Sequence, residues 1–249
     1  MNERSIDSNY RSRIYSRYAS VFQDMPERFD EESSSRWGKA YDYYLREWLP
    51  ESKMADILEL ACGSGRMLHF LKTRSYTNVT GVDISPEQIA VAKQVIPDVF
   101  EADALSFLEP NSDKFDLIIG LDVIEHLNKQ EVLNFLDSCH GALKKGGRII
   151  IQTPNADSVW GNSCYFGDLT HETCFTPASL SKLITLCHFD LIECRETGPP
   201  PFGYSFLSSV RFGTWLLIRA ALLAWNLVEI GEKGSDILTR TFLISAIKK

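Results

Sequence analysis

The sequence has no excess of positive charge. Its 249 residues include 26 Lys and Arg against 33 Asp and Glu, and the net charge is -7 at pH 7. Acidic and basic residues are interspersed, so the chain offers no basic stripe of the kind that a polyphosphate backbone requires. We therefore expect no nucleic-acid partner.

Paired cysteines and an apolar leader are also lacking. The six cysteines form no Cys-x-x-Cys pair, which favours free thiols over a disulfide framework or a zinc site. Residues 1–18 are polar and charged and contain no apolar run typical of a secretion signal. A cytoplasmic location is the expectation, with membrane association as a variant of it. No metal ion is expected, because the spacing of Asp122, Glu125 and Asp168 is not diagnostic of a metal site.

The stretch from Asp56 to Leu71 predicts a strand, a glycine turn and a helix. Residues 57–61 are apolar apart from Glu59, as in a buried parallel strand. Gly63 and Gly65 follow, and apolar residues then recur at helical spacing. Glycines in such a turn allow backbone conformations that a Cβ forbids, and they let a ligand approach the main chain. The stretch therefore predicts a nucleotide-type pocket.

Details of the turn narrow the ligand. Leu68 stands where a dinucleotide fingerprint has its third glycine, and no Lys-Ser or Lys-Thr pair follows to complete a phosphate-cradling loop. The remaining pattern, Glu59-x-x-x-Gly63-x-Gly65, resembles motif I of the class I S-adenosylmethionine-dependent methyltransferases. In such a site the acidic side chain faces the ammonium of the cofactor, and the helix N-terminus favours its carboxylate.

Two further strands are expected to end in acidic residues. Asp83 closes the strand that begins at Asn78 and lies eighteen residues beyond Gly65, where a carboxylate can accept both ribose hydroxyls. The alternative for Asp83, capping of the next helix, fits Ser85 better. Asp103 follows a third strand, and the resemblance implies that it accepts a hydrogen bond from the adenine amino group. A solvated loop residue is the alternative for Asp103.

The segment from Phe115 to Leu127 contains the expected central strand and then Asp122, Glu125 and His126. Its Glu-His-Leu ending resembles a small-molecule branch of the family that includes quinone-biosynthesis O-methyltransferases and many sugar and natural-product enzymes. Residues 168–177, with His171, resemble a lid segment of the same branch. Nucleobase amino-methylases instead carry an Asn- or Asp-Pro-Pro-aromatic loop after this strand, and it is absent here.

The resemblance implies a set of cofactor contacts. Arg36 is a candidate for the methionine carboxylate because it lies on a helix predicted over residues 35–49, although Lys39 is an equal candidate and either can be a solvated charge. The full expected set is Arg36, Glu59, Ala61, Gly63, Gly65, Asp83, Ile84, Asp103, Ala104 and Leu121, all binding S-adenosyl-L-methionine.

Methyl transfer to oxygen usually needs a base, and imidazole titrates near neutral pH. His126 and His171 are the candidates, each with a structural role as its alternative, and Asp122 and Glu125 are weaker ones. The expected reaction is O-methylation of a sugar, polyketide or quinone-like compound. The alternatives are N-methylation of a small amine or aminosugar, a nicotinamide-dependent oxidoreductase, and a non-catalytic fold-mate that binds a partner.

The order of the motifs predicts an α/β fold, Rossmann-like and doubly wound, with a seven-stranded sheet whose last strand is antiparallel. We expect an N-terminal helical cap over residues 1–50 and a core over 51–198 plus 237–249, with a lid at about 155–177. Lys144 to Gly147 are expected to end a helix. An apolar helical insertion fills residues 199–236.

Residues 212–228 form the most apolar part of this insertion. At about 100° per residue, Arg211, Arg219, Asn226 and Glu229 fall within an arc of roughly 80°, which leaves a very wide apolar face. The favoured expectation is a helix packed across the domain, shielding the pocket or contacting a dimer partner. The alternative is an in-plane membrane contact with Trp215 and Trp225 near the interface.

Overall fold

The computed structural model describes residue 11 and residues 13–22, 27–201 and 205–249. The first ten residues of the helical cap expected over residues 1–50 lie outside this part of the chain. Within it, the helices are α2 (Tyr18–Phe22), α3 (Glu31–Tyr44), α4 (Arg66–Thr73), α5 (Pro86–Ala92), α6 (Ala104–Leu108), α7 (Lys129–Ala142), α8 (Gly161–Tyr165), α9 (Pro177–Leu186) and α10 (Phe206–Ile230), with the 3-10 turn η1 (Ile124–His126).

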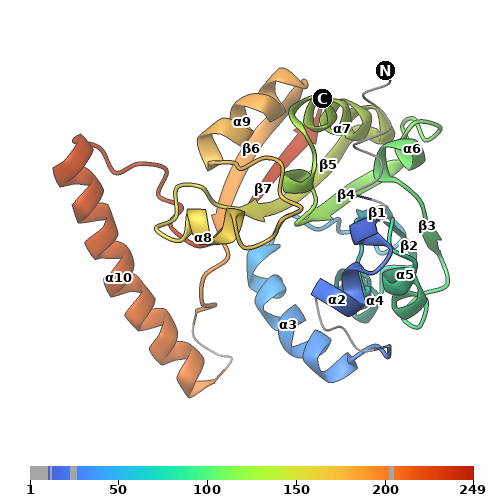
Figure 1. Ribbon diagram of the computed structural model, residues 1–249, viewed down its shortest axis with the longest axis horizontal. Helices are drawn as coiled ribbons and strands as arrows, with labels where there is room; N and C mark the ends of the chain where they lie inside the picture. Colours follow the sequence, from blue (N-terminus) through green and yellow to red (C-terminus); the bar gives the residue numbers. More distant parts are fainter. Residues whose placement is uncertain (1–10, 12, 23–26, 202–204) are drawn as a thin grey trace.

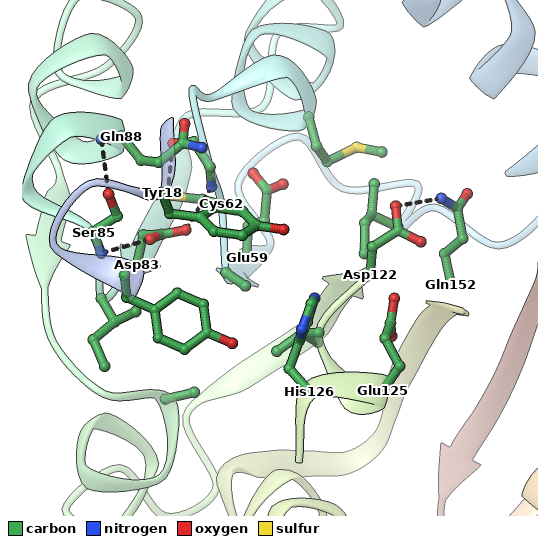
Figure 2. Close-up of a pocket in the computed structure, with 18 of the residues that line it drawn as sticks. Tyr18, Glu59, Cys62, Asp83, Ser85, Gln88, Asp122, Glu125, His126 and Gln152 are labelled. Carbon is green, nitrogen blue, oxygen red and sulfur yellow. Dashed lines mark hydrogen bonds between the residues drawn. The ribbon is translucent and has the colours of Figure 1, made fainter. Parts of the chain in front are cut away.

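The strands form a single seven-stranded sheet in the order β3-β2-β1-β4-β5-β7-β6. They are β1 (Asp56–Leu60), β2 (Asn78–Asp83), β3 (Val99–Glu101), β4 (Phe115–Leu121), β5 (Leu143–Pro154), β6 (Phe189–Glu196) and β7 (Thr241–Lys248). The first five pair in parallel, and β7 runs antiparallel to both β5 and β6. The predicted fold is confirmed (Figure 1). The strand order changes direction between β1 and β4. The carboxyl ends of β1, β2 and β4 therefore lie together, at the position where ligands bind in such sheets (Figure 2).

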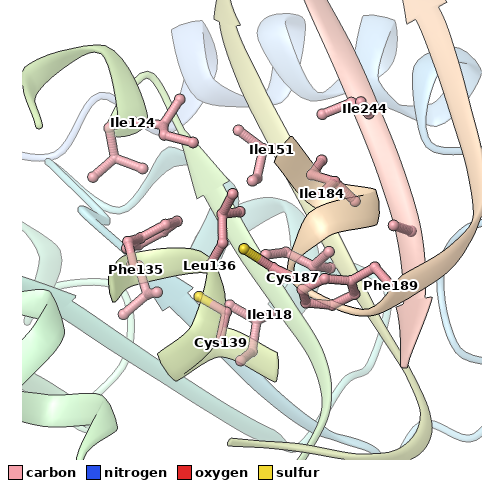
Figure 3. Packing of buried hydrophobic residues seen from close by; sticks show 14 of the residues in the cluster. Ile118, Ile124, Phe135, Leu136, Cys139, Ile151, Ile184, Cys187, Phe189 and Ile244 are labelled. Atoms are coloured by element: carbon pink, nitrogen blue, oxygen red, sulfur yellow. The ribbon is translucent and has the colours of Figure 1, made fainter. Parts of the chain in front are cut away.

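Two apolar layers cover the two faces of the sheet. On one face α7 and α9 pack against the central strands, with Phe135, Leu136 and Ile184 fully buried (Figure 3). Helices α3, α4 and α5 pack against the other face. The apolar layer there includes Tyr41 of α3, Leu45 directly after α3, and Met67 of α4. The central strands read as continuous apolar runs because both of their faces are covered.

Local signals explain several helix starts. Ser85 caps α5 ahead of Pro86, as expected, and Thr176 caps α9 ahead of Pro177. Helix α3 begins at Glu31, four residues earlier than expected, because the Asp30 side chain accepts a hydrogen bond from the Ser33 amide at 2.9 Å. It ends at Tyr44 rather than at residue 49.

The helix expected before Lys144 does end there, since α7 stops at Ala142, but residues 144–147 belong to β5 and do not cap the helix. β5 begins directly at Leu143, which pairs with Phe115 across a bulge. Lys144 donates to Asp56 at 2.7 Å and to Asp116 at 2.9 Å, so its ammonium joins the amino ends of β1 and β4 instead of compensating a helix dipole.

Helix α10 departs most from the sequence expectation. It runs for 25 residues instead of seventeen, from the Ser205 cap to Gly231 in the left-handed conformation. None of its residues is buried, and Figure 1 places it apart from the layers of the domain, so the expectation that it packs across the domain is wrong. Its two connections meet again beside the sheet, where the Thr197 amide donates to Thr239 Oγ1 at 3.2 Å and the hydroxyls of Thr197 and Thr241 lie 2.6 Å apart.

Candidate active site

A cavity of about 770 Å³ opens at the carboxyl ends of β1, β2 and β4. Its volume lies within the usual range for small-molecule sites. The turns after these strands, helix α3, the segment around Tyr18 and the lid supply its walls. Ten of the predicted site residues line it, namely Glu59, Ala61, Gly63, Asp83, Ile84, Asp103, Ala104, Leu121, His126 and His171. Residues from distant parts of the chain therefore meet at one place.

Arg36 is not among the residues that line the cavity. Its side chain is 69% exposed and lies 3.8 Å from Glu32 on the same helix. Trp37 and Tyr41 face the cavity instead, because they lie on another side of α3. Arg66, the first residue of α4, does line the cavity, and its position at a helix N-terminus suits an anionic ligand group.

Gly65 also stays outside the lining and has a packing role. Its φ of +88° is a conformation that L side chains rarely adopt. A Cβ on Gly65 would lie 3.2 Å from Ala92 Cα and 3.3 Å from Val95 Cγ2. This glycine therefore lets α5 approach the turn, whereas Gly63 borders the cavity itself.

Glu59 is the residue of the cavity best suited to receive a cationic group. Its side chain is buried, and burial together with the nearby Asp83 raises its pKa well above the ordinary value. Among the described residues, its Oε2 atom has no hydrogen-bond partner. Figure 2 shows Glu59 in the middle of the cavity, between Asp83 and Asp122. A buried carboxylate oxygen without a partner favours a positively charged ligand group at this point.

Asp83 and Asp103 stand at the ends of β2 and β3. Asp83 accepts from the Gly63 amide at 2.9 Å and from the Ser85 amide at 2.8 Å, so it ties the glycine turn to the next strand. Burial raises its pKa, and these amides act in the opposite direction. Asp103 caps α6 through Ser106. Ile84, which directly follows Asp83 in the chain, is half-exposed and contributes an apolar side chain to the cavity lining.

A hydrogen-bonded chain connects α3 to the central loop. Tyr41 donates to Gln152 Oε1 at 2.6 Å, and Gln152 Nε2 donates to Asp122 at 2.9 Å. Asp122 has a φ of +52°, a strained conformation that often marks functional sites. Sequence reasoning missed Tyr41 and Gln152. The available signal was Gln152 itself, a polar residue directly after the apolar run of β5.

The lid holds His126 by a second chain of hydrogen bonds. Thr170 Oγ1 lies 2.9 Å from His126 Nδ1 and donates to Asp168 Oδ1 at 2.6 Å. Tyr18 donates to the other oxygen of Asp168 at 2.5 Å. Burial raises the pKa of Asp168, but the hydrogen bonds from Thr170 and Tyr18 outweigh it and the pKa is lowered. Burial, and then the nearby His171, lower the pKa of His126.

Glu125, His126 and His171 form a compact group. One ligand atom of each lies within 4.8 Å of the others, an arrangement that could hold a metal ion. Glu125 is buried and accepts from Thr153 Oγ1 at 3.0 Å; burial and then Asp122 raise its pKa. His171 Nδ1 lies 3.0 Å from the Tyr165 carbonyl. The expectation of no metal stays a prediction.

Arg11 contributes from the N-terminal segment, which sequence reasoning left without a site role. It lies in the cavity wall and pairs with Glu131 at 2.7 Å. It also donates to the His126 carbonyl at 3.3 Å. Arg11 thus attaches the beginning of the described chain to η1 and α7, on the same side as the lid.

Comparison with known proteins agrees with this geometry. Residues 10–195 match the methyltransferase-domain family. The chain is 28% identical over 105 residues to a ubiquinone biosynthesis O-methyltransferase of Pseudomonas aeruginosa, which covers 40% of this chain and 44% of that protein. It is 28% identical over 155 residues to an O-methyltransferase of Pyrenophora dematioidea, with 56% of each chain covered. The chain spans about half the length of these curated relatives.

A solved structure supports the fold. The crystal structure of a SAM-dependent methyltransferase from Archaeoglobus fulgidus superposes with a TM-score of 0.63 over 93% of this chain and 98% of that one, at 19% identity. Because the family match covers most of the chain and includes the glycine turn, the acidic strand ends and His126, the chain belongs to the methyltransferase-domain family.

Proposed function

We propose that this protein is an S-adenosylmethionine-dependent methyltransferase that methylates a hydroxyl of a small molecule, of the sugar, polyketide or quinone class. The family match supports methyl transfer, and the names of the two curated relatives support oxygen as the acceptor atom. The observation that carries the proposal is the buried Glu59 oxygen that lacks a partner among the described residues, at the centre of a cavity of suitable size.

The residues around the cavity fit the cofactor. Glu59 would accept the methionine ammonium, and Arg66 at the start of α4, rather than Arg36, would meet the carboxylate. Asp83 would hold the ribose, and Asp103, Ile84 and Ala104 the adenine. When bound, the cofactor supplies an activated methyl group, so the protein has only to position the acceptor, exclude water and remove a proton.

His126 is the proposed base. The single hydroxyl proton of Thr170 points to Asp168, so the Thr170 oxygen accepts from His126 Nδ1–H. The Thr170 carbonyl oxygen also lies 3.3 Å from Nδ1, and because a carbonyl can only accept a hydrogen bond, it too requires the proton to be on Nδ1. His126 Nε2 therefore keeps its lone pair and can take the proton of an acceptor hydroxyl. The lowered pKa of His126 keeps the imidazole neutral at neutral pH.

His126→Ala and His171→Ala test this assignment. Both variants should bind S-adenosylhomocysteine normally by calorimetry, and His126→Ala should lose turnover on hydroxyl acceptors. Undiminished turnover in both variants would move the base elsewhere or favour the N-methyltransferase alternative, since an amine needs no strong base. Cofactor binding without turnover on any acceptor would favour the non-catalytic alternative.

Two remaining parts of the proposal concern the surroundings of the enzyme. We place it in the cytoplasm, in keeping with its six free cysteines. We also assign residues 212–228 to a contact with a membrane or a second copy. Cell fractionation against compartment markers tests the first assignment.

A further inference from the structure

Helix α10 turns its polar side chains toward its own protein. Trp215 Nε1 lies 3.4 Å and Arg219 3.5 Å from Glu196 at the end of β6. Arg219 also donates to the Asp236 carbonyl at 2.9 Å, and Asn226 donates to the Lys233 carbonyl at 3.3 Å. At about 100° per residue, Trp215, Arg219 and Asn226 share one narrow side of the helix.

The opposite side of α10 is mainly apolar, and the hydroxyls of Ser209 and Thr214, which also fall on it, donate to backbone carbonyls of the helix region itself. Its exposed residues span an arc of about 100° and are Phe206, Leu207, Val210, Leu217, Trp225 and Val228. Leu216 and Leu227, also exposed, widen this arc to about 180°. No charged residue falls inside it, since Arg211 and Glu229 lie at its border. We call this exposed apolar arc the outer face. In a soluble amphipathic helix the apolar side packs against the protein, whereas in α10 the polar side does so.

Its length and composition would allow α10 to cross a membrane, but its contacts favour another orientation. Arg219 stands near the middle of the helix and is held to Glu196 at the end of β6 and to Asp236 in the segment that returns from α10. A helix whose middle is fixed beside the domain cannot pass through a bilayer of about 30 Å. It can lie along a surface, over a length of about 37 Å.

The width of the outer face separates a lipid surface from a second copy. Pairing with one helix buries a stripe much narrower than half of the circumference, which would leave most of this face in water. A helix lying in the headgroup region has about half of its circumference covered, which matches the arc. Lipid is therefore the occupant that accounts for the whole face.

The lid carries exposed apolar residues next to the same region. Val159, Trp160, Phe166 and Leu169 are each more than half exposed, and the lid lines the cavity through Cys164, Gly167 and Asp168. The Arg240 guanidinium lies 4.9 Å over the Trp160 ring, just before β7 and after the segment that returns from α10. The apolar lid is thus a neighbour of the segment that returns from α10 to β7.

We propose that the outer face of α10 docks in the plane of a lipid bilayer, with its apolar side chains at the boundary between headgroups and acyl chains. The helix then holds the lid close to the bilayer. This deepens the proposed function by selecting a lipid-soluble ring compound among the acceptor classes, and that selection rests on the proposed function. The docking of α10 on a bilayer does not depend on the proposed function.

Vesicle flotation tests the docking. The full-length protein should float with phosphatidylcholine vesicles, and the bound fraction should not change between low salt and about 0.5 M salt, because the outer face is uncharged. Leu217→Glu combined with Val228→Glu should lower the vesicle-bound fraction about tenfold or more. Leu186→Glu, at an exposed apolar residue of α9, is the matched control and should float like the wild type.

Trp225 reports the depth of insertion. Its fluorescence should shift to the blue with vesicles and be quenched by spin labels near the headgroups more than by labels at the bilayer centre. Trp225→Phe should reduce this change, and the remainder should come from the exposed Trp160 of the lid. Quenching mainly from the bilayer centre would overturn the in-plane orientation.

Three other outcomes overturn the docking proposal: no flotation of the wild type, flotation that salt abolishes, or a dimer in vesicle-free light scattering that the double Glu variant dissociates. Circular dichroism and S-adenosylhomocysteine calorimetry establish that the double variant is folded. Because flotation needs no cofactor, a wild type that floats without binding S-adenosylhomocysteine would refute the proposed function and leave the docking intact.

Discussion

His126 Nδ1 and Thr170 Oγ1 lie 2.9 Å apart, although 44 residues separate them in the chain. Thr170 belongs to the lid and His126 to η1 below it, so the orientation of the proposed base depends on the lid being in place. Thr170 itself is a positioning residue, because it acts through His126.

Thr170→Val removes this hydrogen bond while keeping the shape of the side chain. We expect kcat to fall about tenfold to a hundredfold, as for other residues that orient a functional imidazole. KM and S-adenosylhomocysteine affinity should change little, and Thr170→Ser should restore most of the rate. Nitrogen NMR of His126 should show a smaller share of the Nδ1–H tautomer in the Val variant, because only the longer hydrogen bond to the backbone carbonyl of residue 170 remains. An unchanged tautomer and rate would contradict the role.

The pH dependence follows from the lowered pKa of His126. Burial and the neighbouring His171 disfavour the imidazolium, so the base form persists below the ordinary value of 6.5. The acid limb of kcat should therefore have its midpoint below pH 6.5, and kcat should be level through neutral pH. A midpoint above 6.5 would indicate a different titrating group.

Glu59→Gln separates binding from stability. Loss of a charge-assisted hydrogen bond should weaken S-adenosylhomocysteine binding roughly tenfold to a hundredfold. Because the folded-state pKa of Glu59 is raised, its contribution to stability is present at low pH and is lost as pH rises above the ordinary value of 4.5. The empty Gln variant should therefore melt higher than the wild type at neutral pH. Glu101→Gln, at the exposed end of β3, is the control.

Binding of the cofactor ammonium also requires ionised Glu59. Affinity for S-adenosylhomocysteine should therefore increase with pH in the wild type, and this dependence should be reduced in Glu59→Gln. Calorimetry in buffers of different ionisation enthalpy measures the proton that Glu59 releases.

Arg66→Ala and Arg36→Ala form a matched pair. Arg66 lines the cavity at the start of α4, whereas Arg36 lies in solvent beside Glu32. We expect about a tenfold loss of cofactor affinity for Arg66→Ala and no measurable loss for Arg36→Ala. The reverse ranking would restore the role that the sequence suggested for Arg36.

Gly65→Ala tests the packing role of the turn. The left-handed backbone and the contacts with Ala92 and Val95 should cost about 1–3 kcal/mol of stability in thermal unfolding. Gly141→Ala is the control, because nothing lies within 4 Å of the added Cβ on α7. That substitution should be neutral or stabilise by up to about 1 kcal/mol. Equal effects of the two substitutions would contradict the role.

The sequence predicted the parts of the site that strand ends supply. Glu59, Asp83 and Asp103 were identifiable because parallel strands deliver their carboxyl ends to one edge of the sheet. Arg36 does not line the cavity as the sequence suggested. The pattern predicted α3 but could not show which side of that helix would face the cavity. Trp37 and Tyr41 occupy that side.

Long-range pairings were beyond the reach of the pattern. Nothing local connects Tyr18 with Asp168 or Tyr41 with Gln152, because each pair joins segments more than a hundred residues apart. For α10 the pattern gave the apolar face correctly, but burial depends on what stands opposite that face. None of the residues of α10 is buried, so no part of the domain among the described residues covers that face.

The hydrogen bonds that join Thr197 to Thr239 and Thr241 close the sheet beneath α10. The long helix is therefore an insertion between two strands, β6 and β7, that pair with each other without its help.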